Sequence, residues 1–209
     1  MSTNEFPAVT VIGAGNIGAA VAQIAVKAGS ATQVLARDLS KASAVSPSVS
    51  AGTIGDPITG DIVVLALPYS ALGDVLAAYP DGFAGRIVVD PTNPIDFGTL
   101  DSIVADAGSS SAAELAKRLS GATVLKAFNT TLAATLAAGV TGGAPTTVLV
   151  AGDDAEAKAQ LSSIIEAGGL RAVDAGPLKR AHALEAVGSV LIGLLITQQT
   201  APTGGFALV

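Results

Sequence analysis

Three glycines near the start of the chain, at positions 13, 15 and 18, limit the fold more than any other feature. They follow a short apolar run at residues 8–12, which is typical of a strand buried on both faces. An Ala- and Val-rich stretch at residues 16–28 predicts a helix directly after them. Strand, GxGxxG loop and helix in this order indicate a dinucleotide-binding unit.

Each glycine of the loop has a separate reason to be there. Gly13 permits the tight turn, Gly15 lets the backbone approach a pyrophosphate, and Gly18 lets the helix pack closely on the strand. Free N–H groups at the positive end of the helix then face the phosphates. The residues expected to contact the dinucleotide here are Gly13, Ala14, Gly15, Asn16, Ile17 and Gly18.

Strand-like and helix-like stretches alternate along the rest of the chain. Short runs rich in Val and Ile predict strands at residues 62–67, 86–89 and 146–150, with weaker ones at 33–36, 124–127 and 170–173. Between these runs, helices are expected at residues 70–78 and 111–119 and after Asp153 and Asp154. The alternation predicts an α/β fold: a Rossmann-type, doubly wound, mostly parallel sheet with a small C-terminal helical extension. Residues 40–60 show little periodicity, so we expect a shortened crossover there.

The last long helix is expected from about residue 178 to 199, and it is apolar on every face from Val190 to Ile196. A helix that is apolar all round must be covered all round. We expect a second copy of the chain to provide part of that cover in a homodimer; burial within one subunit is the alternative. We divide the chain into a Rossmann domain at residues 1–143 and a smaller α/β part with this helix at 144–209.

Composition excludes several function classes. With no Cys and one His, the chain has no thiol nucleophile, no disulfide and no multi-His metal site, so no metal is expected. The net charge of −6 and the lack of a basic block argue against nucleic-acid binding. No apolar run approaches the roughly 20 residues that a bilayer requires, and the start resembles no signal peptide, so a cytoplasmic protein without membrane contact is expected. A cofactor is then expected to carry any chemistry.

The end of the second predicted strand bears on the choice between NADP and NAD. Ala36 is small and leaves room above it, and Arg37 and Lys41 follow, placed to hold a 2′-phosphate. Asp38 lies at the roughly 20-residue spacing of an acid that binds the ribose of NAD, which keeps NAD as the alternative. We favour NADP.

Six stretches in one order give the sequence a recognisable pattern. They are Gly13–Gly18, Ala36–Arg37 with Lys41, Ile62–Tyr69, Ile87–Pro94, Lys126–Thr130 and Asp174–Leu178. The pattern resembles the family of coenzyme F420-dependent NADP oxidoreductases and the related NADPH-binding domain of membrane ferric reductases. The resemblance covers nearly the whole chain.

The resemblance implies hydride transfer between nicotinamide and a deazaflavin, with NADP and F420 or a flavin stacked in one cleft, a reaction that depends on proximity. Leu67, Pro68 and Tyr69 would then lie along the ribose and nicotinamide. The same edge would be lined by Asn93, Pro94, Asn129 and Thr130, and Ala133 would approach the carboxamide. Asn129, Thr130 and Tyr69 are the cleft candidates for a catalytic role. Lys126, Lys179 and Arg180 are the candidate cations for an anionic tail at the cleft mouth, and an ordinary surface charge is the alternative for each of them.

Two departures from the family keep the second substrate open. Ala14 stands where the family often has Thr, and Asn129 stands where some deazaflavin-dependent members have His. An NADPH-dependent flavin or ferric-chelate reductase is therefore one alternative. A non-catalytic NADP-binding, redox-sensing module is another.

Overall fold

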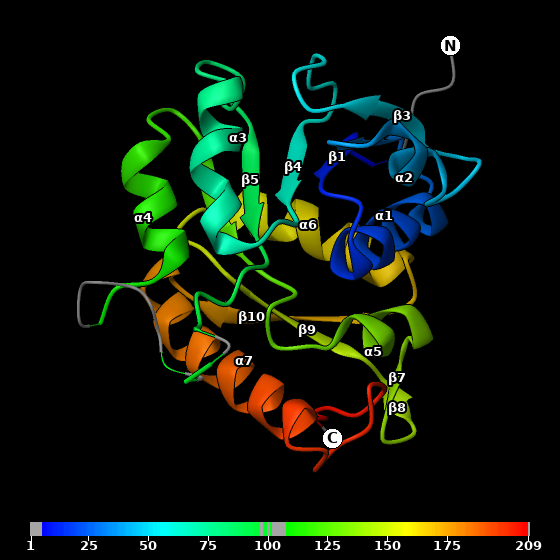
Figure 1. The fold of residues 1–209 in the computed structure, drawn as a ribbon, viewed down its shortest axis with the longest axis vertical. Helices are drawn as coiled ribbons and strands as arrows, with labels where there is room; N and C mark the ends of the chain where they lie inside the picture. The colour runs from blue at the N-terminus through cyan, green and yellow to red at the C-terminus, as the bar shows by residue number, and fades with distance from the viewer. Residues whose placement is uncertain (1–5, 97, 100, 102–107, 209) are drawn as a thin grey trace.

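A computed structural model describes residues 6–96, 98–99, 101 and 108–208. Its centre is an eight-stranded sheet in the order β10-β9-β6-β5-β4-β1-β2-β3 (Figure 1). The strands are β1 (Val9–Ile12), β2 (Thr32–Ala36), β3 (Ser50–Thr53), β4 (Ile62–Leu65), β5 (Ile87–Asp90), β6 (Thr123–Lys126), β9 (Thr147–Ala151) and β10 (Arg171–Gly176). The inner strands β1 and β4 are buried along their whole length, as their unbroken apolar runs predict.

Helices cover both faces of the sheet (Figure 1). They are α1 (Asn16–Ala28), α2 (Leu39–Ser43), α3 (Leu72–Ala78), α4 (Ser111–Arg118), α5 (Ala133–Ala138), α6 (Ala155–Ala167) and α7 (Ala181–Ile196), with short 3-10 turns η1 (Tyr69–Ala71) and η2 (Leu178–Arg180). Helices α1 and α6 pack in one apolar core, whereas α3 and α4 pack in a second core on the opposite face. The predicted doubly wound arrangement is confirmed.

The sheet is parallel from β3 to β6 and changes direction once. Strands β9 and β10 are parallel to each other, but β9 meets β6 in antiparallel orientation through the single pair Lys126–Ala151. The carboxyl ends of β1, β2, β4, β5 and β6 therefore lie at one edge. Open α/β sheets bind their ligands at such an edge.

The segment between β2 and β4 confirms the shortened crossover. It holds only the five-residue helix α2 and the four-residue strand β3. The sequence did not predict helix α5 or the hairpin of β7 (Val140–Thr141) and β8 (Ala144–Pro145), because elements of six and two residues are too short for periodicity to detect. The left-handed Gly142 and Gly143 make the turn of that hairpin.

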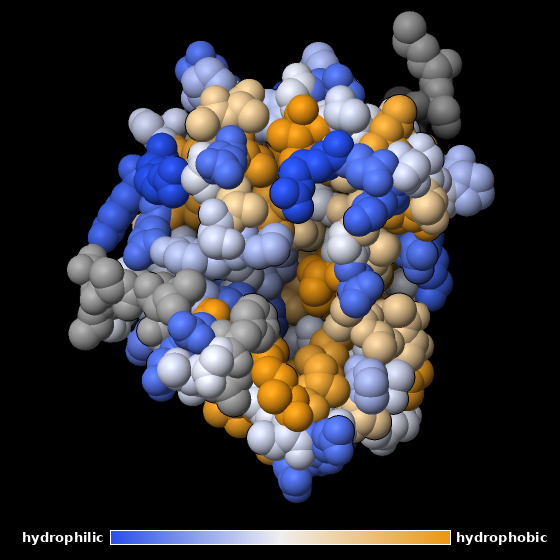
Figure 2. Space-filling view, viewed as in Figure 1, coloured by the Kyte–Doolittle hydropathy of each residue, from blue (hydrophilic) through white to orange (hydrophobic). Residues whose placement is uncertain are grey.

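Helix α7 is only half covered by its own chain. Ala181, Leu184, Gly188 and Leu191 face the protein, whereas the large apolar side chains that remain exposed on this helix are Val187, Val190 and Ile196. Figure 2 shows apolar side chains gathered over the carboxyl half of this helix. Burial within one subunit, the alternative considered for this helix, is therefore wrong. Among the described residues, no helix is both long and apolar enough to cross a membrane.

Candidate functional site

A cavity of about 280 Å³ opens at the carboxyl ends of β1, β2 and β4. Seven of the predicted contact residues line it: Gly13, Ala14, Gly15, Arg37, Lys41, Leu67 and Pro68. The other lining residues are Ala36, Asp38, Ile54 and Ala66. The glycine loop, the end of β2 and the segment after β4 thus meet around one space, which we call the dinucleotide pocket.

The glycine loop has the geometry that its spacing predicts. Gly13 has a φ of +115°, in the region that favours glycine. A Cβ atom on Gly18 would collide with the carbonyl of Gly13, so this position keeps α1 close to β1. A Cβ atom on Gly15, in contrast, would meet no protein atom within 4 Å. Gly15 therefore leaves open space beside the first turn of α1, the kind of helix N-terminus that suits an anion.

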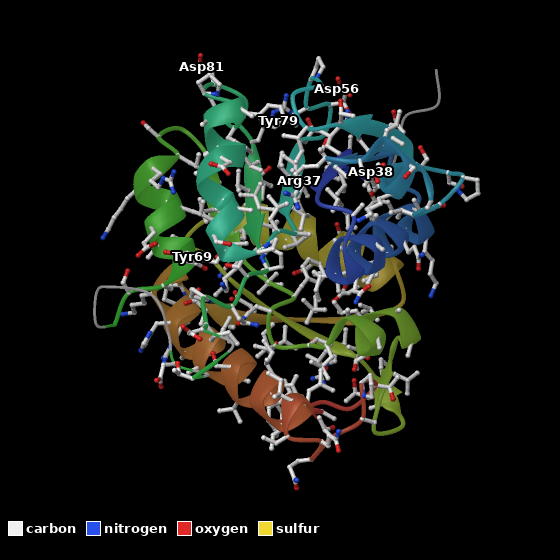
Figure 3. The ribbon with its side chains drawn as sticks, viewed as in Figure 1. Arg37, Asp38, Asp56, Tyr69, Tyr79 and Asp81 are labelled. Atoms are coloured by element: carbon white, nitrogen blue, oxygen red, sulfur yellow. The ribbon has the colours of Figure 1, made fainter. Side chains whose placement is uncertain are left out.

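Arg37 and Asp38 follow the end of β2 (Figure 3), and Lys41 follows in α2; all three line the pocket. Within the described part of the chain, neither Arg37 nor Lys41 forms an ion pair with a carboxylate. Asp38 caps α2, because its Oδ1 accepts from Ser40 Oγ at 2.7 Å and from Ser40 N at 2.9 Å. These hydrogen bonds lower the pKa of Asp38. The cations are thus available to an external anion while Asp38 is engaged locally.

The remaining predicted residues lie outside the lining of this pocket. Asn16 and Ile17 begin α1 and Gly18 packs beneath them. Pro94 and Thr130 are buried in the segments after β5 and β6. Ala133 is half-buried at the first position of α5. Ile54, which follows β3, is a lining residue that the sequence did not single out, because the crossover gave no periodic signal.

Tyr69 lies on the α4 side of α3, apart from Arg37 (Figure 3). Its hydroxyl donates a hydrogen bond to Glu114 Oε2 on α4. Both residues line a second cavity, of about 240 Å³, together with Ser70, Ser111 and Arg118. Partial burial, followed by the hydrogen bond to Glu114, raises the pKa of Tyr69 to about 12. The two cavities flank the consecutive residues Pro68 and Tyr69.

Asn93 and Asn129 form a reciprocal pair. Asn129 Nδ2 donates to Asn93 Oδ1 at 2.9 Å, and Asn93 Nδ2 donates to the carbonyl of Asn129 at 2.8 Å. Asn129 Nδ2 also donates to the carbonyl of Leu184 on α7 at 2.9 Å. Both amide N–H groups of Asn129 are thus used, and among the described residues its Oδ1 is buried without a hydrogen-bond partner. Phe128, buried just before it, has a φ of +68°, which is unusual for a residue with a side chain.

Lys126 is not at the cleft mouth, and its predicted role as a surface cation for an anionic tail is wrong. Its side chain is fully buried. Lys126 Nζ lies 3.0 Å from Asp90 Oδ2 and 2.7 Å from Glu185 Oε1. The end of β6 places the ammonium inside the protein, between the end of β5 and α7. Lys179 and Arg180 are exposed in η2, before α7.

The buried cluster around Lys126 was missed by sequence reasoning. Ser111 Oγ lies within hydrogen-bond distance of Asp90, Lys126 and Glu185, and Ser111 N donates to Glu185 Oε1 at 3.0 Å. Burial raises the pKa of Glu185, although Lys126 and Ser111 favour its charged form. One signal was present: Asp90 and Lys126 each end a buried strand, and they face each other in the β5–β6 register.

His182, the single histidine, is exposed at the start of α7. Its Nδ1 lies 3.0 Å from the carbonyl of Ser109. This contact fits a structural role. His182 is not among the residues that line either cavity.

This chain is similar to known proteins in sequence and in fold. The model of the family described as "NADP oxidoreductase coenzyme F420-dependent" matches residues 8–94. The F420-dependent NADP reductase of Methanothermobacter thermautotrophicus is 32% identical over 175 residues, which are 80% of this chain and 71% of that protein. Metalloreductase STEAP3 of Rattus norvegicus is 30% identical over 184 residues, 88% of this chain. The chain spans only 36% of the length of that metalloreductase.

Two solved structures have a fold similar to that of this chain. A putative F420-dependent NADP reductase from Arthrobacter sp. FB24 has a TM-score of 0.80 at 24% identity, with 97% of this chain and 100% of that one covered. The hypothetical protein SMa0349 from Sinorhizobium meliloti has a TM-score of 0.74 at 32% identity, with 84% and 88% covered.

Proposed function

The chain belongs to the family of coenzyme F420-dependent NADP oxidoreductases, and from that membership we propose that it transfers a hydride between NADP(H) and a deazaflavin of the F420 type. The observation that carries this proposal is the dinucleotide pocket, in which the glycine loop and the cations Arg37 and Lys41 face the same space. The loop suits the pyrophosphate and the cations suit a 2′-phosphate.

The nicotinamide, when bound, supplies or receives the hydride, and the protein supplies binding and orientation. Leu67 and Pro68 continue the pocket wall beyond the glycine loop, in the direction of Tyr69. We assign the ribose and nicotinamide to this end of the pocket, with Asn93, Asn129, Thr130 and Ala133 in the neighbouring segments. Two rings held in contact there need little acid–base help, which agrees with a chain that has one His and no Cys.

A second candidate function is reduction of a flavin or a ferric chelate by NADPH. The similarity to a metalloreductase over 88% of this chain favours it, as does Asn129 in place of the His of some deazaflavin-dependent members. The proposed NADP site is the same in both functions, so only the acceptor distinguishes them.

Turnover assays decide between these functions. Purified protein is mixed with NADPH and, in separate reactions, with oxidised F420, FMN, FAD and a ferric chelate, and NADPH absorbance is followed. The proposal expects oxidation of NADPH with F420. Turnover with FMN or the chelate but not with F420 would support the second candidate. NADPH binding without any turnover would indicate a redox-sensing module.

We also propose that a second copy covers the exposed apolar side of α7. Val187, Val190 and Ile196 are each more than a third exposed in the single chain. Water contact with this apolar surface is unfavourable, and a two-fold axis beside the helix would bury the same face of both copies.

A further inference from the structure

We propose that Lys126 is a positioning residue for the nicotinamide end of the site. Its buried ammonium fixes the three segments that carry Asn93, Asn129 and the first turns of α7, and it contacts no substrate itself. This inference rests on the proposed function, because it concerns the geometry of that same site.

The ammonium connects four parts of the fold. Lys126 Nζ, at the end of β6, donates to Asp90 Oδ2 at the end of β5 and to the carbonyl of Thr92 just after it. It also donates to Ser111 Oγ at the start of α4 and to Glu185 Oε1 on α7. An ammonium has three N–H donors, so four oxygen atoms saturate it.

Each contact is close in sequence to a residue of the proposed site. The carbonyl of Thr92 accepts a hydrogen bond from Lys126, and Thr92 directly precedes Asn93. Asn129 follows Lys126 by three positions, through the left-handed Phe128. Glu185 follows Leu184, whose carbonyl accepts the hydrogen bond from Asn129. The ammonium therefore fixes the backbone segment of Asn93 through Thr92 and that of Asn129 through Lys126 itself. Through Glu185 it also fixes α7, which accepts a hydrogen bond from Asn129.

The packing leaves these segments little freedom to compensate. A Cβ atom on Gly188 would collide with the side chain of Asn93 and lie 2.7 Å from the carbonyl of Asn129. Helix α7 thus rests directly on the asparagine pair, one turn beyond Glu185. A shift of α7 after loss of Lys126 would be transmitted to both asparagines.

The charges explain why an apolar residue at position 126 would disturb the cluster. Asp90 is fully buried and Glu185 is nearly so, and Lys126 is the positive charge between them. Without it, two carboxylates would face each other in the interior, and loss of one partner from a buried ion pair is strongly destabilising. The repulsion between the two carboxylates would then be relieved by movement of α7 or by protonation of one carboxylate.

The test compares Lys126→Met with wild type and with Lys158→Met. Lys158 pairs with Asp174 at 2.8 Å, but Asp174 is 62% exposed, so the control makes the same substitution at a surface pair. Three quantities are measured: the Kd of NADPH, kcat with F420, and the share of deuterium transferred from NADPH labelled on either face of nicotinamide C4. The fluorescence of bound NADPH reports the ring environment without any acceptor.

We expect Lys126→Met to keep the Kd of NADPH within about twofold, because no residue that contacts Lys126 Nζ lines the dinucleotide pocket. We expect kcat to fall about 10- to 100-fold, as for a small misplacement of reacting groups, with a loss of facial selectivity and altered NADPH fluorescence. Lys158→Met should match wild type in all four measurements. Unchanged kcat, selectivity and fluorescence in Lys126→Met would overturn the inference, as would a rise in Kd parallel to the fall in kcat.

Glu185→Gln serves if Lys126→Met does not fold. The glutamine keeps the shape and an acceptor for Lys126, while Lys126 and Asp90 remain as a balanced pair. A smaller fall in kcat with reduced facial selectivity supports the inference, and wild-type behaviour contradicts it. Failure of the proposed function is separate: wild-type protein would then not oxidise NADPH with F420, although the fluorescence comparison would still test Lys126.

Discussion

Asp90 and Lys126 end adjacent parallel strands and meet as a register pair whose side chains form a buried ion pair of 3.0 Å. Two charged residues thus end two mainly apolar strands at the edge where the candidate site lies. The pair is completed by Glu185 from α7, at the far end of the chain. The C-terminal helix is therefore part of the structure of this edge.

Arg37→Ala should weaken NADPH binding and leave NADH binding unchanged, because only NADPH carries the 2′-phosphate. A charge-assisted contact contributes about 1.5–3 kcal/mol, so the Kd of NADPH should rise about 10- to 150-fold. Titration of NADPH fluorescence measures it. Arg171→Ala, at the other edge of the sheet, is the matched control. An equal loss for both cofactors would show that Arg37 does not recognise the 2′-phosphate.

Gly188→Ala should destabilise the fold by about 1–3 kcal/mol, because the new methyl group would overpack against Asn93 and Asn129. Urea unfolding measures the change in the free energy of unfolding. Gly73→Ala in α3 is the control, since its Cβ atom would meet no protein atom within 4 Å. Equal stability of Gly188→Ala and wild type would mean that α7 can move away from the asparagine pair.

Tyr69 should ionise near pH 12 rather than at its ordinary value of 10. The folded state binds the phenolic proton more tightly, so the stabilisation is complete below pH 10 and is lost as the pH rises toward 12. The chain has two tyrosines, so the phenolate absorbance of wild type minus that of Tyr69→Phe isolates this group. Glu114→Gln should bring the pKa of Tyr69 down. A difference titration centred at or below 10 would contradict the contact with Glu114.

Glu185→Gln should change the pH dependence of stability. Burial raises the pKa of Glu185 above its ordinary 4.5, so its contribution to stability is greatest below that pH and falls as the pH rises through the folded-state pKa. Wild type should thus lose stability relative to the glutamine variant as the pH rises above 4.5 and through the folded-state pKa of Glu185. Urea unfolding at several pH values measures the difference, and a constant difference would contradict the prediction.

Val190→Asp should convert the proposed homodimer to a monomer, because Val190 is 57% exposed on the apolar side of α7. A buried, unpaired carboxylate in the interface is strongly unfavourable. Sedimentation of micromolar protein should change from twice the chain mass to 20.3 kDa. Ala159→Asp, on an exposed position of α6, is the control. A wild-type chain that sediments only as a monomer would remove the dimer.

The parts of the fold predicted from sequence are those set by local pattern. The glycine loop, the strands buried on both faces and helix α1 follow from periodicity and turn chemistry, and α1 has the predicted bounds. Arg37 and Lys41 line the dinucleotide pocket, because the end of a strand fixes where its next residues lie, and their contact with NADP stays a prediction.

The parts not predicted depend on contacts between distant segments. Lys126 looked like a surface cation, since its neighbours in sequence do not reveal Asp90, Ser111 or Glu185 around it. The turn to antiparallel pairing at β9 likewise has no local sign, because a buried strand shows the same apolar run in either direction.

The single backbone pair between Lys126 and Ala151 also bears on protein engineering. Strands β9 and β10 are attached to the parallel part of the sheet by this one pair in register, whereas β9 and β10 share several pairs with each other. In a recombined chain that joins β1–β6 to the carboxyl part of a relative, β6 and β9 therefore have to form only one backbone pair in register. The recombined chain has to match the charge of the helix that faces Lys126, so successful chimeras should retain an acid at position 185.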